Sequence, residues 1–470
     1  MADTVKEVKE DDALVEMATS CREGSLALQV LSTEKRAAIL HRVADKLVDH
    51  ESQILNTNME DVAEASNQID DALMKRLKLK PDKIKQLAQG IRQIADSKEP
   101  IGNLISKTQI MKGLVLDKIT VPIGVLLIIF EARPDALPQI AALAIKSGNG
   151  LLLKGGKEAA KSNSLLHRII GDAIEEVAPE VGRSVIGLVQ TRAAIGELLK
   201  LDSVIDLVIP RGSNSFVSYI QNNTKIPVMG HSDGICHIYV DDEGDLGMAL
   251  SVCVDAKVDY CAACNAVEKI LVHESWAKGD GLKKIADALV DAGVKVNKGT
   301  HPSLDGFDLP KAPSPKIEYS SMEVTLEVVG SLDEAVRHIN QYSSKHTDSI
   351  ITTNKEKAEE FIKRIDSACV FHNTSTRWAD GFRFGLGAEV GISTSRIHAR
   401  GPVGVEGLLS TKWVLRGNGH VVKGDYLKDE YTMSELCIDV YQAVKPGLIG
   451  FGAGVVASVA IGMLAAKMRR

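Results

Sequence analysis

The chain has 470 residues, of which 44% are hydrophobic and 25% are charged. This balance excludes a disordered or fibrous chain, and the length favours two or three domains. With 56 Lys and Arg against 62 Asp and Glu, the net charge of -6 excludes a generally basic nucleic-acid-binding protein. Seven cysteines, an odd number spread over a long chain, favour reduced thiols over a disulfide scaffold.

Residues 1–104 are charged and carry apolar side chains at every third or fourth position, which predicts amphipathic helices packed on a larger domain. The acidic beginning has no apolar stretch and fits neither a secretory signal nor a basic transit peptide. Residues 105–120 follow as two short strands joined at Lys112 and Gly113.

From residue 121 onward, continuous apolar runs alternate with helix-patterned segments. The strands are expected at 124–130, 150–156, 184–190, 203–213 and 225–229, and the helices at 136–147, 158–177, 193–201 and 216–222. This alternation predicts βαβ units around a parallel sheet. A second alternation over 235–415 predicts another domain of the same α/β class.

Two of the predicted strand ends are rich in glycine and positive charge, namely KGGK at 154–157 and PRGSN at 210–214. Backbone amides in front of a helix suit a phosphate group, although an ordinary tight turn is an equally good interpretation. No GxGxxG motif occurs between residues 121 and 234, so this is not the standard dinucleotide turn.

Cys261 and Cys264 stand three apart between the two alternating regions. A zinc site needs further ligands, and the chain has no second CxxC and no HxxxH pair, so we expect no metal site. One nucleophilic thiolate near an anion site is the remaining functional interpretation. A buried inert cysteine is the commoner outcome for a single thiol.

Residues 447–466 form an uncharged, glycine-rich segment with Lys445 before it and Lys467 after it. A helix of that length would extend about 30 Å, the thickness of a bilayer core. Small residues recur at every fourth position from Gly450 to Gly462, so two such helices could approach closely. We expect a membrane-spanning tail helix with a cytoplasmic body; a buried helix or an oligomer contact is the alternative.

Three segments, at 121–163, 257–273 and 371–413, closely resemble gamma-glutamyl phosphate reductase and the reductase half of plant-type delta-1-pyrroline-5-carboxylate synthetase. The resemblance spans roughly residues 26–422 and places the chain in the aldehyde dehydrogenase superfamily. It implies an α/β, aldehyde dehydrogenase-like fold with two doubly wound parallel-sheet domains plus oligomerisation strands. The implied reaction is NADPH-dependent reduction of L-glutamyl 5-phosphate to glutamate 5-semialdehyde with release of phosphate, in proline synthesis.

The resemblance also implies a division of the chain and a homo-oligomer. The expected parts are N-terminal helices packed on the cofactor domain (1–104), an oligomerisation hairpin (105–120), an NADP-binding domain (121–234), a catalytic domain (235–410), an oligomerisation strand (411–424), a linker (425–446) and the tail helix (447–466).

The implied reaction proceeds through a cysteine thioester. Cys264 is the implied nucleophile, and Asn265 lies beside it in the catalytic turn. The implied cofactor-binding residues are Lys154 for the adenosine ribose, Glu318 for the nicotinamide ribose, and Gly212 and Ser213 beside the pyrophosphate.

Departures from ordinary aldehyde dehydrogenases favour reduction over oxidation. Residues 227–234 lack the Glu that activates water in those enzymes. The thioester is therefore expected to persist until hydride reduces it. His231 is either a base or a structural histidine. Arg133 replaces part of the usual oxyanion segment and is either a phosphate ligand or a surface arginine. Lys157, where NAD-preferring relatives often have Glu, would attract a 2′-phosphate and therefore favours NADP.

The segment that begins at residue 371 supplies the expected substrate contacts, His372, Asn373, Arg377 and Asp380. Arg377 and Asp380 are candidates for the α-carboxylate and α-amino groups, and a solvated loop pair is the alternative. Only about 25 residues precede the region of resemblance, so we expect a separate glutamate 5-kinase as a partner. Rival functions are a membrane-displayed, non-catalytic scaffold and another acyl-reducing or aldehyde-oxidising relative.

Overall fold

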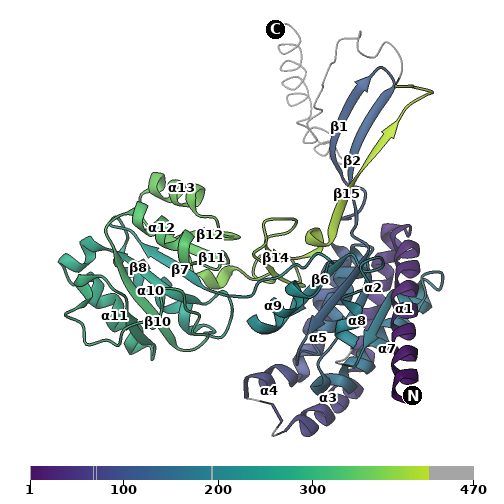
Figure 1. Ribbon diagram of the computed structural model, residues 1–470, viewed down its shortest axis with the longest axis horizontal. Helices are drawn as coiled ribbons and strands as arrows, with labels where there is room; N and C mark the ends of the chain where they lie inside the picture. The colour runs from purple at the N-terminus through teal and green to yellow at the C-terminus, as the bar shows by residue number, and fades with distance from the viewer. Residues whose placement is uncertain (1, 67, 70, 192–193, 423–470) are drawn as a thin grey trace, which may run out of the picture. The chain divides into compact units, whose positions relative to one another are not determined.

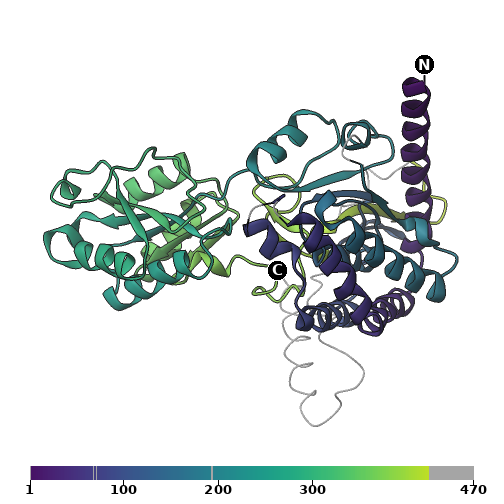
Figure 2. The same cartoon turned by 90° about the horizontal axis from the view of Figure 1, so that it is seen from below.

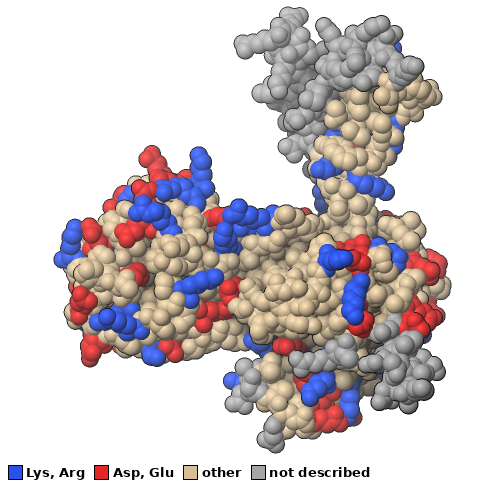
Figure 3. Space-filling view, viewed as in Figure 1, with Lys and Arg blue, Asp and Glu red and all other residues tan. Residues whose placement is uncertain are grey.

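The computed structural model describes residues 2–66, 68–69, 71–191 and 194–422. Contacts divide the chain into a large unit, Met1–Ile101 with Pro122–Ser410, and a small one, Gly102–Val121 with Thr411–Arg470. The large unit contains two parallel sheets (Figure 1). Lysine, arginine, aspartate and glutamate side chains are interspersed over the face in Figure 3, in keeping with the small net charge.

The first sheet has the strand order β5-β4-β3-β6, with all neighbours parallel. Its strands are β3 (Val125–Phe130), β4 (Gly150–Lys154), β5 (Ile186–Val189) and β6 (Leu207–Arg211). Every residue of β3 and β4 is buried, as expected for a sheet covered on both faces. The register pairs Ile129 with Lys154 and Phe130 with Arg211, so the loops after β3, β4 and β6 leave from one edge of the sheet.

Helices cover both faces of this sheet, and the purple N-terminal ones lie against its teal strands in both views (Figures 1 and 2). The helices are α1 (Ala2–Gln29), α2 (Thr33–Asp49), α3 (Glu51–Ala65), α4 (Asp71–Leu77), α5 (Pro81–Asp96), α6 (Ala136–Lys146), α7 (Ala160–Val177), α8 (Ala194–Leu198) and α9 (Asn214–Asn222). Side chains of β3 alternate between the faces: Leu126 and Ile128 join the core with α2, α5, α6 and α7, whereas Val125 and Leu127 join the core with α1 and α8.

The second sheet has the order β12-β11-β7-β8-β10-β9 and is also parallel. Its elements in chain order are β7 (Cys236–Val240), α10 (Leu246–Val258), β8 (Val267–His273), α11 (Gly281–Asp291), β9 (Lys295–Lys298), β10 (Glu323–Val329), α12 (Leu332–Tyr342), β11 (Thr347–Ile351), α13 (Lys355–Arg364) and β12 (Cys369–His372). One core contains α10 and α11 and another contains α12 and α13, so this sheet too is doubly wound.

The remaining strands form small antiparallel sheets. The small unit has the order β1-β2-β15, with β1 at Leu104–Met111, β2 at Leu114–Pro122 and β15 at Leu409–Arg416. Trp413 and Leu415 on β15 are exposed. In the large unit β13 (Gly391–Ser393) pairs with β14 (Gly401–Val403). The role of the small unit in oligomerisation stays a prediction.

The strand expected at 225–229 is wrong. Only an isolated bridge between Val208 and Val228 forms there. Thr224 accepts a hydrogen bond from the amide of Ile226 and donates one to the carbonyl of Leu199, so the segment begins as a local turn.

The expectation of a membrane-spanning protein also needs correction. In the described part of the chain, no helix combines the length and the apolar character needed to cross a bilayer. The tail at 447–466 on which that expectation depended lies outside the described residues, as does the linker at 425–446. A membrane-spanning helix is therefore wrong for the described part of the chain, and the cytoplasmic location stays a prediction.

Asn58 on α3 holds three segments together from a buried position. Its amide nitrogen donates to the carbonyl of Leu77 at 3.0 Å and to the hydroxyl of Ser162 at 3.3 Å, and its oxygen accepts from the amide of Leu79 at 2.7 Å. This side chain therefore ties the connection from α4 to α5 to both α3 and α7.

We predict that Asn58→Ala destabilises the protein by about 1–3 kcal/mol, because it leaves a buried carbonyl and a buried amide without partners. Scanning calorimetry should show a lower melting temperature for this variant, while Asn56→Ala, at an exposed position on the same helix, should melt like the parent. Equal melting temperatures for the two variants would contradict the prediction.

Candidate active site

Cys264 lies in the turn between α10 and β8. Within this turn the amide of Ala263 donates to the carbonyl of Tyr260 at 3.1 Å, and the amide of Ala266 donates to the carbonyl of Ala263 at 2.9 Å. The turn leads into β8 at the edge of the second sheet where the parallel strands begin. Residues that precede β7, β8 and β11 therefore meet at one edge, because parallel neighbours start together.

Gly234 permits the closest of these contacts. A Cβ atom at this position would lie 2.5 Å from the carbonyl oxygen of Cys264 and 2.6 Å from its Cα. Any side chain at residue 234 would therefore push the cysteine turn away from the start of β7, and only glycine allows the observed approach.

Burial separates Cys264 from most other thiols of the described chain, all of which are free. Desolvation raises the pKa of Cys21 and Cys253 to about 12 and that of Cys369 to about 11. It also raises the pKa of Cys236, whose thiol donates to the carbonyl of Cys264 at 3.3 Å. Because the thiolate is the nucleophile, these buried thiols are poorly suited to attack, whereas Cys264 is only half-buried.

Two histidines accompany the thiol. One ring nitrogen of His231, one of His346 and the sulfur of Cys264 all lie within 4.8 Å of one another. The Nδ1 of His231 donates to the carbonyl of Ile392 at 2.8 Å, so Nε2 is left to accept a proton. Burial, helped by the positive charge of Arg211, lowers the pKa of His231 below its usual 6.5, so the ring is neutral near pH 7.

His346 was missed by the sequence analysis. It precedes β11, its ring is fully buried, and its Nε2 has no hydrogen-bond partner among the described residues. Together with His231 and Cys264 it offers donor atoms of the type that bind zinc, although only the fold brings them together. A second group of possible metal ligands, the carboxylates of residues 241–243, is already paired with Lys357, whose ammonium nitrogen lies 3.2 Å from Asp241 and 3.0 Å from Glu243.

Arg133 and Arg211 bring positive charge to the end of the first sheet. Arg211 ends β6, and Arg133 lies in the loop after the neighbouring strand β3, where the strand order of the sheet reverses. Such a switch point is the usual ligand crevice of an open α/β sheet. Burial lowers the pKa of Arg133, and the positive charges of Arg211 and Arg76 lower it further. An arginine nevertheless keeps its charge in proteins, so this end of the sheet attracts anions.

The predicted cofactor-binding residues of the first sheet lie at or just after the carboxyl ends of β4 and β6. Lys154, the last residue of β4, is buried and donates to the carbonyl of Gly155. Lys157, three residues later, is exposed. Gly212 and Ser213 lie between β6 and α9, and a Cβ on Gly212 would come within 2.9 Å of the Phe216 ring. These glycine turns and the exposed ammonium group fit the phosphates of a dinucleotide.

Glu318 belongs to a loop whose backbone is held by hydrogen bonds to Glu268. The negative charge of Glu318 acts on His231, the histidine beside the thiol. Glu268 holds the loop by accepting from the amides of Tyr319 at 3.1 Å and Ser320 at 3.3 Å, and it pairs with buried Lys257 at 2.9 Å. Burial raises the pKa of Glu268 to about 7.

Asn265 and Arg377 bind each other. The Arg377 guanidinium donates to the Asn265 side-chain oxygen, and at 3.0 Å to Asp259. The amide nitrogen of Asn265 donates to the carbonyl of Ala379 at 2.9 Å. Arg383 also donates to Asp259, at 2.8 Å. These polar groups therefore join the loop at 377–383 to the cysteine turn, and their roles with substrate stay predictions.

The other expected substrate residues are also engaged within the fold. His372 donates to the carbonyl of Thr352 at 3.0 Å, and the side chain of Asn373 bonds to both the carbonyl and the amide of Thr352, each at 2.9 Å. Asp380 accepts from the amides of Phe382 and Arg383, each at 3.0 Å. The structure does not bring these three to the thiol through any described hydrogen bond, and their substrate roles stay predictions.

Comparison with known proteins identifies the family. The model for the aldehyde dehydrogenase family matches residues 3–305. The chain belongs to the aldehyde dehydrogenase family. It is 46% identical over 421 residues to gamma-glutamyl phosphate reductase of Acetivibrio thermocellus, covering 88% of this chain and 96% of that one. A crystal structure of gamma-glutamyl phosphate reductase from Thermotoga maritima superposes with a TM-score of 0.83 at 36% identity, covering 87% of this chain and 100% of that one.

Delta-1-pyrroline-5-carboxylate synthase 1 of Oryza sativa subsp. japonica is 55% identical over 422 residues, which are 89% of this chain but only 58% of that protein. The chain thus spans little more than half the length of this relative. The resemblance and the aldehyde dehydrogenase fold expected from the sequence are both confirmed. Membership of the family implies a nicotinamide cofactor, which the glycine turns after β4 and β6 fit.

We predict that His231→Gln slows the alkylation of Cys264 by iodoacetamide at pH 7 by about tenfold, because the variant lacks the imidazole proposed to take the thiol proton. In the parent the rate should fall further once the pH is low enough to protonate His231, and burial places that step below the usual histidine range. Peptide mass spectrometry separates Cys264 from Cys261, and His41→Gln, at a half-buried position on α2, is the control. An unchanged rate and pH profile in His231→Gln would refute the assignment.

Proposed function

We propose that this aldehyde dehydrogenase reduces L-glutamyl 5-phosphate to L-glutamate 5-semialdehyde and releases phosphate, as a step of proline synthesis. The observation that carries the proposal is the half-buried thiol of Cys264 beside a neutral histidine, in a chain that covers almost the whole of a relative named gamma-glutamyl phosphate reductase. An acyl phosphate is already activated, so the site must supply a nucleophile, positive charge for the phosphate and a place for the hydride donor.

The first step follows from the geometry around the sulfur. The Cys264 sulfur attacks the acyl carbon, the bond from that carbon to the phosphate oxygen breaks, and a thioester forms. The thiol proton passes to Nε2 of His231, whose Nδ1 stays fixed on the carbonyl of Ile392. Positive charge from Arg133 and Arg211 stabilises the departing phosphate.

A bound nicotinamide supplies the hydride that reduces the thioester. The chain supplies the two glycine turns for its phosphates, with Lys154 and Glu318 as the proposed ribose partners. Hydrolysis is disfavoured because the segment at 227–234 offers no free carboxylate to activate water, and its histidine, His231, serves the thiol. Its only carboxylate, Asp233, binds the amide of Asn214 and lies 4.0 Å from Lys316.

Partners follow from the chemistry of the substrate. An acyl phosphate is labile, and a reaction that phosphorylates a carboxylate must precede this one. We propose that a separate kinase supplies it directly. The exposed apolar side chains Trp413 and Leu415 of β15 support a homo-oligomer formed through the small unit.

We predict that Cys264→Ala loses at least about 1,000-fold in rate, as expected when a covalent nucleophile is removed. The assay is the reverse reaction, NADP reduction by glutamate semialdehyde with inorganic phosphate. Cys261→Ser, three residues away in the same turn, is the matched control and should keep the parental rate. Turnover that persists in Cys264→Ala, or that is faster with an acyl-CoA assay than with phosphate in the parent, would refute the proposed function.

We further propose that NADP is preferred over NAD because Lys157 attracts the 2′-phosphate. Lys157→Glu should raise the KM for NADP by about tenfold or more, equivalent to roughly 1.4 kcal/mol, and leave the KM for NAD within about twofold. Steady-state kinetics with both cofactors measures the change. Lys225→Glu, also exposed, makes the same change in net charge and should behave like the parent; an equal effect in both variants would contradict the assignment.

A further inference from the structure

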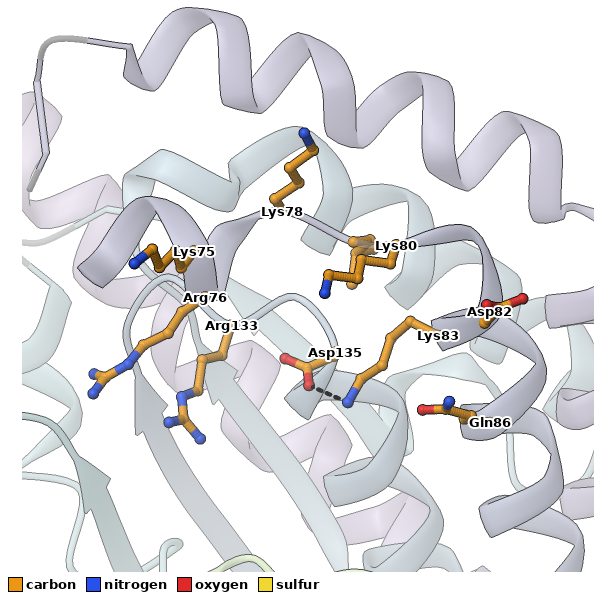
Figure 4. Close-up of a pocket in the computed structure, with 10 residues that line it drawn as sticks. Lys75, Arg76, Lys78, Lys80, Asp82, Lys83, Gln86, Arg133 and Asp135 are labelled. Atoms are coloured by element: carbon orange, nitrogen blue, oxygen red, sulfur yellow. Dashed lines mark ion pairs between the residues drawn. The ribbon is translucent and has the colours of Figure 1, made fainter. Parts of the chain in front are cut away.

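A basic pocket of about 420 Å³ lies between the connection from α4 to α5 and the loop after β3 (Figure 4). Most of its lining side chains are positively charged, namely Lys75, Arg76, Lys78, Lys80, Lys83 and Arg133. Asp82 and Asp135 also line it, and Asp135 is neutralised by Lys83 at 3.0 Å. Substantial positive charge is therefore left in the pocket for a ligand.

The two arginines of the pocket, Arg76 and Arg133, contribute part of that uncompensated charge in planar form. Neither Arg76 nor Arg133 forms an ion pair with a carboxylate in the part of the chain that the structure describes, and Nε of Arg76 is buried without a hydrogen-bond partner. In Figure 4 both side chains extend to the same side, Arg76 from α4 and Arg133 from the loop after β3. Two neighbouring guanidinium groups repel each other, and an anion bound by both would offset that cost.

The pocket is connected to the thiol through Arg133. Besides Arg76, the groups that act on the charge of Arg133 include Arg211 and Tyr260. Tyr260 opens the turn that contains Cys264, and the charge of Arg211 also acts on His231. Arg133 thus acts electrostatically on both the pocket and the cysteine turn, while Arg211 is paired with Glu389 at 3.8 Å. An anion held by Arg76 and Arg133 can therefore be part of the reacting molecule.

We propose that Arg76, together with Arg133, binds the phosphoryl group of the acyl phosphate. The inference rests on the proposed function and adds a substrate-binding residue on α4. A phosphoryl group has charge and oxygen atoms for two planar guanidinium groups. It is also attached to the carbon that Cys264 attacks, so its binding site must adjoin the thiol. The substrate α-carboxylate carries a single charge beside its own ammonium group and does not need two arginines.

The test varies inorganic phosphate in the reverse reaction with glutamate semialdehyde and NADP. Arg76→Gln should raise the KM for phosphate at least about tenfold. Arg76→Lys should raise it less, because a lysine keeps the positive charge but loses the paired donors of the planar guanidinium. The KM values for semialdehyde and NADP should stay within about twofold of the parent. Lys85→Gln, an exposed change on α5 outside the pocket, should match the parent.

A second measurement keeps the proposal separate from turnover and from the folding of the variants. In the parent protein, inorganic phosphate should protect Arg76 and Arg133 from modification by phenylglyoxal, as followed by peptide mass spectrometry. An unchanged KM for phosphate in Arg76→Gln, a rise only in the KM for semialdehyde, or modification of Arg76 at the same rate with and without phosphate would each overturn the proposal. A parent that protects Arg76 but shows no phosphate-dependent turnover would support the pocket and refute the proposed function.

Discussion

The candidate site depends on the hydrogen-bond register of the parallel strands β7, β8 and β11. Cys236 pairs with Val267, and Asp348 pairs with His237, so the three strands start at the same edge of their sheet. The residues just before them, Gly234, Cys264 and His346, are neighbours for that reason alone. The approach is close enough that residue 234 must lack a side chain. A thiol placed by a sheet register is held more precisely than one placed on a free loop, which matters for an attack that requires alignment.

A second constraint comes from Asp259, which ends α10 just before the cysteine turn. Its carboxylate accepts from both Arg377 and Arg383, and Arg377 in turn holds the side chain of Asn265. Two segments far apart in the sequence are therefore tied together around one carboxylate. Because arginine can donate several hydrogen bonds in fixed directions, a single residue at position 377 fixes both the loop and the turn. The segment that begins at residue 371 therefore has a structural role, because its arginines hold the cysteine turn in place. This role is independent of any contact with substrate.

The sequence was most informative where burial imposes a simple pattern. The apolar run at 124–130 predicts β3 almost to the residue, since a strand covered on both faces must be apolar throughout. Cys264 was singled out by the family resemblance of the segment around it, at 257–273. His346 and Arg76 could not be found in the same way, because neither belongs to a local motif and each reaches its neighbours only through tertiary structure. The strand expected at 225–229 failed for the opposite reason: a short apolar run resembles a strand, but its backbone makes only one bridge.

The electrostatics of the site favour a substrate that loses its anionic group during the reaction. In the proposed reaction, uncompensated arginine charge binds the phosphoryl group before attack. The neutral ring of His231 can take the thiol proton without adding a carboxylate that would oppose that binding. Once the acyl carbon has been transferred to sulfur, the phosphate no longer tethers the organic part of the substrate to the arginines. The aldehyde product does not carry the phosphoryl group that bound the arginines. It can therefore dissociate without breaking that interaction. An ordinary aldehyde has no phosphoryl group. The pocket that assists acyl-phosphate reduction therefore contributes little to the binding of an uncharged aldehyde.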